Sequence, residues 1–320
     1  MKQKQTKDGI LREPIVVGAG TKYPLKGILT LPASDTPVPA VVLVHGSGSS
    51  NRDEKVMKLT PFLDLAEGLA ARGIASIRYD KRSFAHPFKL LTDKTAPLTV
   101  REETMEDAVL AAEMLRNDPR IDSGAVFVIG HSMGGMLAPR IDAEGGNFRG
   151  LVIMAGSPRK LEEILADQTA EMLSQLPEAV RKSTEKKVNR LMAGFDGLYS
   201  LTDEEAQKRK FGGGTTMYYF KEMGEHPVEM YLQSTGKPIL ILQGEADFQV
   251  KADTDFRLYK EMLAGHDNVT FQLYEGLNHA FVPTLGAPVT QAKKEYGKER
   301  HIGPEVLDDI AAWIGSVCRG

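Results

Sequence analysis

The sequence predicts an α/β fold in which a mostly parallel central sheet carries helices on both faces. Apolar runs of strand length alternate with segments whose apolar residues recur at helical spacing. Several runs are continuously apolar, which is typical of parallel strands covered on both sides. A Gly-x-Ser-x-Gly pentapeptide at 130–134 lies directly between one such run and a helical segment.

Composition is that of an ordinary globular domain, with 320 residues, 42% hydrophobic and 26% charged. A net charge of −3 gives no indication of a nucleic-acid or anionic membrane partner. The one cysteine, Cys318, allows no disulfide within the chain and suits a reducing compartment. No apolar signal region or membrane-length apolar run is visible. We therefore expect a cytoplasmic protein; the oligomeric state is not indicated.

The elements of the first half follow in order along the chain. Strand-like pieces at 14–17 and 26–31 are separated by glycines and a proline, which predicts an antiparallel hairpin at the sheet edge. Residues 32–39 form a loop rich in Pro, Ser and Asp. Strands and helices then alternate: strand 41–44, helix 62–70, strand 74–77, helix 101–116, strand 125–129, helix 134–143 and strand 151–155.

The alternation stops between 157 and 236, where helical patches occur without a clear strand run. A structureless loop of this length is improbable in a compact domain. The pattern then resumes with strand 238–243, helix 253–263, strand 269–274 and helix 304–317. We therefore expect one core domain from 13–156 and 237–317, interrupted by a helical insertion at 157–236.

The pentapeptide Gly130-His131-Ser132-Met133-Gly134 has the strand–turn–helix context of a nucleophile elbow. Such a turn strains the serine backbone, and a side chain at either glycine would crowd the neighbouring strand or helix. It lifts the Ser132 Oγ clear of the sheet edge. It also places the Met133 N–H at a helix N-terminus, where a developing oxyanion can be held.

Three further features follow predicted strands, at the edge where open α/β sheets bind ligands. The turn His45-Gly46-Ser47-Gly48 can aim a backbone N–H into the site as a second oxyanion donor. Asp247 follows strand 238–243, with Glu245 as the alternative acid, and His279 follows strand 269–274. A serine hydroxyl needs a histidine to remove its proton, and the histidine needs a carboxylate to fix its tautomer.

With these motifs the chain resembles the α/β-hydrolase superfamily, in which the triad also runs Ser, Asp, His. Asn51-Arg52-Asp53-Glu54 and Tyr79-Asp80-Lys81-Arg82 resemble the bacterial esterase and acyl-hydrolase group related to dienelactone hydrolases. The resemblance implies Ser132 as nucleophile, His279 as base and Asp247 as orienting acid. It further implies an oxyanion hole of the Ser47 and Met133 N–H groups, and a cap at 157–236. The chain departs from the usual glycines at Arg82-Ser83-Phe84-Ala85-His86, which makes that loop less predictable.

The predicted function is a serine hydrolase that cleaves carboxylic esters of small to medium acyl groups through an acyl-enzyme intermediate. No cofactor or metal is expected, because the histidines lack ligand spacing. An acyl thioesterase or a prolyl-oligopeptidase-like peptidase would use the same triad. A binding protein on a hydrolase fold is the alternative from another class.

Residues beside these motifs have structural interpretations. His131 is expected to pack or support the site, and His45 to support the oxyanion loop. Arg52 and Asp53 are expected to pair near the site.

Overall fold

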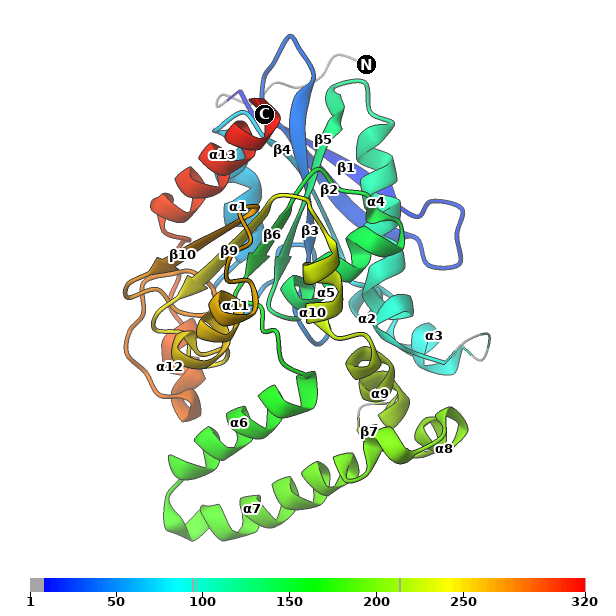
Figure 1. The fold of residues 1–320 in the computed structure, drawn as a ribbon, viewed down its shortest axis with the longest axis vertical. Coiled ribbons are helices and arrows are strands. Elements are labelled where there is room, and N and C mark those ends of the chain that lie inside the picture. The colour runs from blue at the N-terminus through cyan, green and yellow to red at the C-terminus, as the bar shows by residue number, and fades with distance from the viewer. Residues whose placement is uncertain (1–8, 94, 96, 213, 320) are drawn as a thin grey trace.

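The computed structural model describes residues 9–93, 95, 97–212 and 214–319, which build an eight-stranded sheet (Figure 1). The strand order is β1-β2-β4-β3-β5-β6-β9-β10. Their bounds are β1 Leu11–Val17, β2 Leu25–Leu31, β3 Val38–Val44, β4 Ala75–Tyr79, β5 Ile121–His131, β6 Leu151–Met154, β9 Ile239–Gly244 and β10 Val269–Tyr274. β1 pairs antiparallel with β2, and β2 with β4, while the other neighbours are parallel. The predicted fold class and the antiparallel edge hairpin are confirmed.

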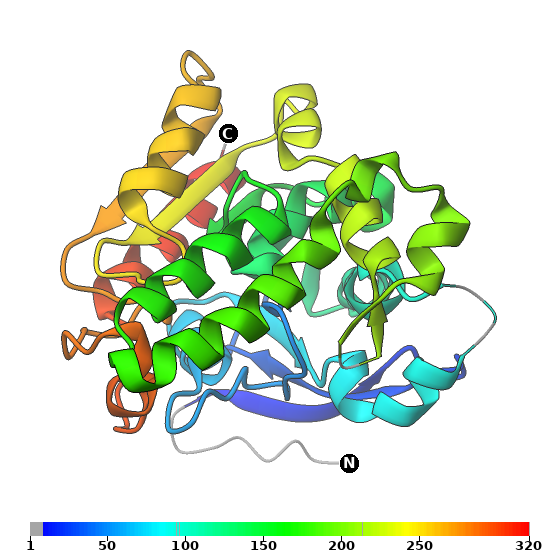
Figure 2. The same ribbon diagram turned by 90° about the horizontal axis from the view of Figure 1, so that it is seen from below.

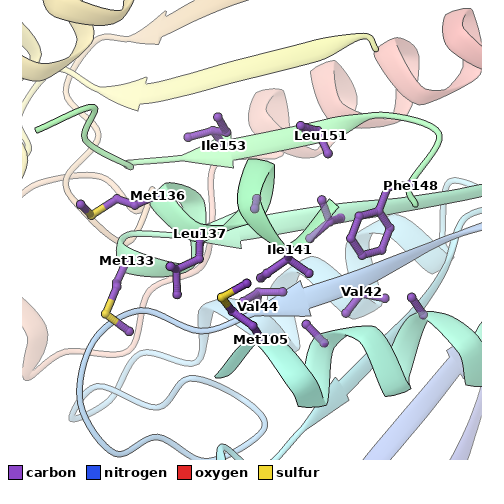
Figure 3. Packing of buried hydrophobic residues seen from close by; sticks show 14 of the residues in the cluster. Val42, Val44, Met105, Met133, Met136, Leu137, Ile141, Phe148, Leu151 and Ile153 are labelled. Carbon is purple, nitrogen blue, oxygen red and sulfur yellow. The ribbon is translucent and has the colours of Figure 1, made fainter. Parts of the chain in front are cut away.

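The sheet separates two apolar cores because successive side chains of a strand point to opposite faces. On β3, Val42 and Val44 belong to one core, and Val41 and Leu43 to the other. Figure 3 shows the first core, where buried side chains of α5 meet those of the neighbouring strands. The helices around the first core include α4 (Glu106–Arg116), α5 (Met133–Ile141) and α11 (Arg257–Met262); α1 (Pro61–Ala70) and α13 (Pro304–Arg319) cover the second.

Three predicted helices differ in detail from the structure, and the one expected over 134–143 is α5 followed by the π-helical turn η2 (Asp142–Gly146). The helix expected over 101–116 begins as a π-helical turn, η1 (Arg101–Met105), before α4. The helix expected over 253–263 likewise begins with the π-helical turn η5 (Ala252–Phe256) before α11. The structure adds the short helices α2 (Arg82–Ala85), α3 (Pro87–Thr92) and α12 (Ala292–Tyr296). No helix in the described part of the chain combines the length and apolarity that crossing a membrane requires.

Helices dominate the described residues between β6 and β9. In chain order they are α6 (Leu161–Ser174), α7 (Glu178–Met192), the short turns η3 (Ala193–Phe195) and η4 (Leu198–Ser200), α8 (Asp203–Lys208), α9 (Met217–Glu225) and α10 (Val228–Ser234). A two-stranded sheet of β7 (Lys210–Gly212) and β8 (Thr215–Thr216) lies among them, where no strand was expected. Figure 2 shows α6 and α7 side by side across the molecule. Of these two helices, only Ile164 is buried.

Candidate active site

Ser132 lies in the sharp turn between β5 and α5. Its backbone has φ 54° and ψ −121°, a left-handed conformation that is strained for a residue with a side chain. Its N–H donates to the Met154 carbonyl oxygen at 2.8 Å, which ties the turn to β6. A Cβ on Gly130 would lie 2.1 Å from the Gly134 oxygen, and one on Gly134 would lie 2.1 Å from the Val44 oxygen. The expectation that side chains there would crowd the helix and the strand is confirmed.

His279 and Asp247 meet on the loops that follow β10 and β9. The His279 Nδ1 lies 2.6 Å from the Asp247 Oδ2, so an Nδ1–H would donate to the carboxylate and leave Nε2 free to accept a proton. Asp247 also accepts from the Gln243 side chain at 3.0 Å and from two backbone N–H groups of its own loop. This fully buried carboxylate is therefore fixed in position and well hydrogen-bonded. The carboxylate beside His279 is Asp247, not Glu245.

A second buried carboxylate, Glu295 of α12, fixes the loop that carries His279. Asn278 donates from Nδ2 to the Glu295 Oε1 at 2.7 Å and accepts the Ala280 N–H at 3.0 Å. Burial alone would raise the pKa of Glu295, but hydrogen bonds from Asn278 and from backbone N–H groups hold it below its usual value. No motif in the sequence pointed to Glu295, because its partners lie on a different loop.

The loop after β3, predicted to hold an oxyanion, lies directly against Ser132. A Cβ on Gly46 would lie 3.0 Å from the Ser132 Cβ. His45 donates from Nε2 to the Asn51 carbonyl oxygen at 3.0 Å, as expected for a residue that supports this loop. Burial lowers the pKa of His45 to about 4, so its ring is neutral at pH 7. The hydrogen bonds of the described residues include none from the N–H of Ser47 or Met133.

Gly46 is held at both its N–H and its carbonyl group by buried charged side chains. Its N–H donates to the Glu54 Oε1 at 2.7 Å, and its oxygen accepts from the Lys81 Nζ at 2.9 Å. Burial lowers the pKa of Lys81 below its ordinary value, while the nearby Glu103 and Glu54 carboxylates act in the opposite direction. Glu54 and Lys81 both lie within the sequence motifs described above, but the motifs indicated no role for either residue.

Glu54 also pairs with His131, the residue before Ser132. The Glu54 Oε2 lies 2.9 Å from the His131 Nδ1, and the His131 Nε2 donates to the His279 carbonyl oxygen at 2.8 Å. The rings of His131 and His279 are in contact, tilted by 49° with their centroids 4.8 Å apart. Burial would lower the pKa of His131, but the Glu54 charge raises it above the usual value. His131 therefore connects Glu54 to the backbone of His279, which is the geometry of the supporting role predicted for it.

The expected pairing of Arg52 with Asp53 is wrong. Arg52 instead makes a two-pronged contact with Asp80 at 3.0 Å, and Asp53 pairs with Arg78 at 2.9 Å. Both partners, Asp80 and Arg78, lie on or just after the strand β4, so Arg52 and Asp53 fasten this loop to the carboxyl end of β4.

Ser47, Ser132 and His279 line one pocket of about 400 Å³. Its other walls are largely apolar and come from the loop after Glu54, from α12 and from the segments around it; they include Val56, Met57, Phe248, Ala280, Val289 and Tyr296. Gln168 of α6 also reaches this pocket and donates to the Gln249 carbonyl oxygen at 3.0 Å. A larger cavity of about 480 Å³, between the β1–β2 hairpin and α4, contains none of the predicted site residues.

Comparison with known proteins gives consistent matches. The model of the alpha/beta hydrolase family matches residues 41–292. Esterase EstD of Thermotoga maritima is 34% identical over 292 residues, which are 91% of this chain and 65% of that protein. This chain therefore spans just under two thirds of the length of this relative.

Two solved structures extend the comparison to three dimensions. The Pyrococcus furiosus esterase Pf2001 aligns with a TM-score of 0.58 at 15% identity, covering 99% of this chain and 94% of that one. Est1E of Butyrivibrio proteoclasticus aligns with a TM-score of 0.56 at 13% identity, covering 95% and 99%. At such identities the likeness shows the fold alone.

Proposed function

The chain belongs to the alpha/beta hydrolase family, and from that premise we propose that it is a serine esterase. It would cleave carboxylic esters of small to medium acyl groups through an acyl-enzyme intermediate. Ser132 is the proposed nucleophile, His279 the base and Asp247 the orienting acid. The relative EstD is named an esterase, which supports the reaction class.

The observation that carries the proposal is the His279–Asp247 hydrogen bond of 2.6 Å beside a strained serine turn in the same pocket. A buried carboxylate that receives the Nδ1–H leaves the opposite ring nitrogen as a base. Strain of this kind persists only where the surrounding structure enforces it, and it clusters at active sites.

The first half of the proposed reaction forms the acyl-enzyme. The Ser132 Oγ attacks the ester carbonyl carbon while the His279 Nε2 takes the hydroxyl proton. The carbonyl oxygen becomes an oxyanion that accepts hydrogen bonds from the backbone N–H groups of Ser47 and Met133. Neither N–H has a protein acceptor among the described residues. In other serine hydrolases, removing one such donor costs roughly 3–4 kcal/mol. The intermediate then expels the alcohol, which receives the proton from His279.

The second half returns the free enzyme. A water molecule gives a proton to His279 and attacks the acyl carbon, and the second oxyanion uses the same two N–H groups. Collapse breaks the Ser132 Oγ–acyl bond, and the proton returns from His279 to the serine oxygen. The product is a carboxylic acid.

Pocket size and lining support the substrate class. About 400 Å³ of largely apolar space accommodates a small or medium acyl chain, whose burial is favourable by about 0.8 kcal/mol per CH₂ group. We also propose that 157–236 is a cap on a core of 13–156 and 237–317. Gln168 supports this assignment, because it comes from α6 and lines the pocket.

The test combines covalent labelling with turnover. Wild type should gain one fluorophosphonate adduct by intact mass, Ser132→Ala should gain none, and Ser316→Ala on α13 should label like wild type. With p-nitrophenyl esters of rising acyl length, turnover should fall at long chains. An adduct that persists in Ser132→Ala would refute the nucleophile assignment.

Matched substrates separate the esterase from its alternatives. An oxygen ester, a thioester and an aminoacyl amide with the same acyl group should be hydrolysed in that order of kcat/KM. A preference for the thioester or the amide would favour the thioesterase or peptidase activity. Absence of both labelling and turnover in folded protein would favour a binding protein.

A further inference from the structure

Lys81 is buried behind the oxyanion loop. It follows β4, is 1% exposed, and ranks among the largest fully buried side chains of the described residues. A buried ammonium is costly unless it is paired and hydrogen-bonded. Its Nζ donates to the Gly46 oxygen at 2.9 Å and lies 3.5 Å from the Glu103 Oε1. Among the described residues, the backbone acceptor of Lys81 is thus the carbonyl of Gly46, the residue that lies against the proposed nucleophile Ser132.

The Gly46 carbonyl belongs to the same planar peptide unit as the Ser47 N–H. In a trans peptide the oxygen and the hydrogen point in opposite directions. Lys81 therefore contacts one end of this dipole, while the other end is the proposed donor to the oxyanion. A cation at the oxygen withdraws electron density from the peptide, and hydrogen bonds in such a chain strengthen one another.

We propose that Lys81 is a positioning residue of the oxyanion hole, which orients and polarises the Gly46–Ser47 peptide so that the Ser47 N–H binds the oxyanion of the transition state. This inference rests on the proposed esterase function. Because the effect acts on a charge that develops during reaction, it lowers the barrier more than it strengthens substrate binding.

The surroundings of Lys81 keep the peptide in one orientation. Glu54 accepts the Gly46 N–H at 2.7 Å, so the residue is fixed at both its polar groups. Glu103, the carboxylate nearest to Lys81, accepts the Tyr219 hydroxyl at 2.7 Å. Tyr219 comes from α9, so the proposed cap contributes to the same buried network.

The test removes the cation together with its counter-ion, so that no lone buried charge remains. Lys81→Met/Glu103→Gln shortens the first side chain by one atom, keeps the length of the second and leaves an acceptor for Tyr219. The matched control is Arg82→Met/Asp107→Asn, which removes a neighbouring buried pair with a 2.6 Å contact that does not touch the loop. Lys81→Gln/Glu103→Gln is a second neutral variant, should methionine not be accommodated.

Kinetics on p-nitrophenyl butyrate distinguish positioning from packing. In Lys81→Met/Glu103→Gln, kcat per folded enzyme should fall about tenfold to a hundredfold with little change in KM, because losing a whole oxyanion donor costs about 10²–10³. Lys81→Gln/Glu103→Gln should show a smaller loss in the same direction. Arg82→Met/Asp107→Asn should keep both kinetic constants.

A trifluoromethyl ketone gives an independent readout. The Ser132 Oγ adds to its carbonyl carbon, the proton passes to His279, and the former carbonyl oxygen becomes an oxyanion. Affinity for this ketone should fall by the same factor as kcat, while affinity for the unreactive methyl ketone should stay constant. A ¹⁹F NMR titration should show the bound oxyanion protonating at higher pH without Lys81.

The outcomes separate the inference from the function on which it rests. Unchanged kcat in both Lys81 variants, equal losses in the Arg82 control, or equal weakening of both ketones would overturn the role of Lys81 while wild-type ester turnover stands. Wild type without ester turnover or Ser132 labelling would instead overturn the esterase assignment, and the inference with it.

Discussion

At the residue scale, the contact of Asp247 with His279 determines which ring nitrogen carries the proton. In Asp247→Asn, the side-chain amide can donate to Nδ1 and so stabilise the tautomer with its proton on Nε2. That nitrogen could no longer accept the serine proton. We expect kcat to fall by a factor of about 10⁴ with little change in KM, measured on a short-chain p-nitrophenyl ester.

Glu245→Gln is the matched control, because Glu245 was the alternative acid two residues away. It should keep the wild-type kcat. A large loss in Glu245→Gln with activity retained in Asp247→Asn would reverse the assignment.

The buried ion pair of Glu54 and His131 predicts a pH-dependent stability. Burial would raise the pKa of Glu54, but the charge of His131 holds it below its ordinary value of 4.5. Its contribution to the free energy of unfolding is therefore present above pH 4.5 and lost as the pH falls through the folded pKa. The Glu54 charge likewise raises the pKa of His131 above its ordinary value of 6.5, against the effect of burial. Its contribution to the free energy of unfolding is therefore present below pH 6.5 and lost as the pH rises through the folded pKa. Together they stabilise the fold most between these two pH values.

Glu54→Gln should therefore lower the free energy of unfolding by about 3 kcal/mol near pH 5.5, and by less at pH 9. Urea unfolding at the two pH values measures this difference. Glu113→Gln, at an exposed position of α4, should show no such dependence. An equal loss at both pH values would mean that the pair does not ionise as described.

The sequence marks the residues that carry a local signature, but it does not mark those whose role depends on a partner far away along the chain. Ser132 is marked by its flanking glycines. Glu295 supports the His279 loop through contacts across another loop, and Arg52 pairs with Asp80 rather than with its neighbour. Spacing along the chain does not encode such pairings.

At the element scale, α6 and α7 are the helices least supported by the core. α7 has no buried residue, and α6 has only Ile164, whereas every residue of α5 is buried. Helices of this length are marginal in water without tertiary packing. By hydrogen exchange with mass spectrometry, the amides of α7 should exchange at least about tenfold faster than those of α5.

α13 provides an internal control, since it is as long as α7 but packs four apolar residues onto the sheet. Its amides should resemble those of α5. Equal protection of α7 and α13 would show that α7 is covered in solution by something outside the described chain.

Periodicity predicted the long elements and failed for the short or irregular ones. The helix over 304–317 has a strong apolar face and was found as α13. The π-helical turns η1 and η5 have the same side-chain pattern as α-helix, so the sequence cannot distinguish them. β7 and β8 are too short to show an alternating pattern.

At the scale of the whole molecule, the sheet brings distant parts of the chain to one edge. Ser132, Asp247 and His279 follow three different strands, and the proposed oxyanion loop with Ser47 follows a fourth. Parallel strands present their carboxyl ends at the same edge, which explains why the predicted residues meet there. The alternation of strands and helices predicted this arrangement, but the order of the strands within the sheet came only from the structure.

The long connection between β6 and β9 has a consequence for how the fold can vary. These parallel neighbours need a crossover in any case, and α10, packed on α5, already brings the chain back to the sheet. The segment from α6 to α8 is additional length, whereas α9 is largely buried against the core, and closing a longer loop costs little extra free energy. We therefore expect relatives to differ more between α6 and α8 than in the strands that precede Ser132, Asp247 and His279.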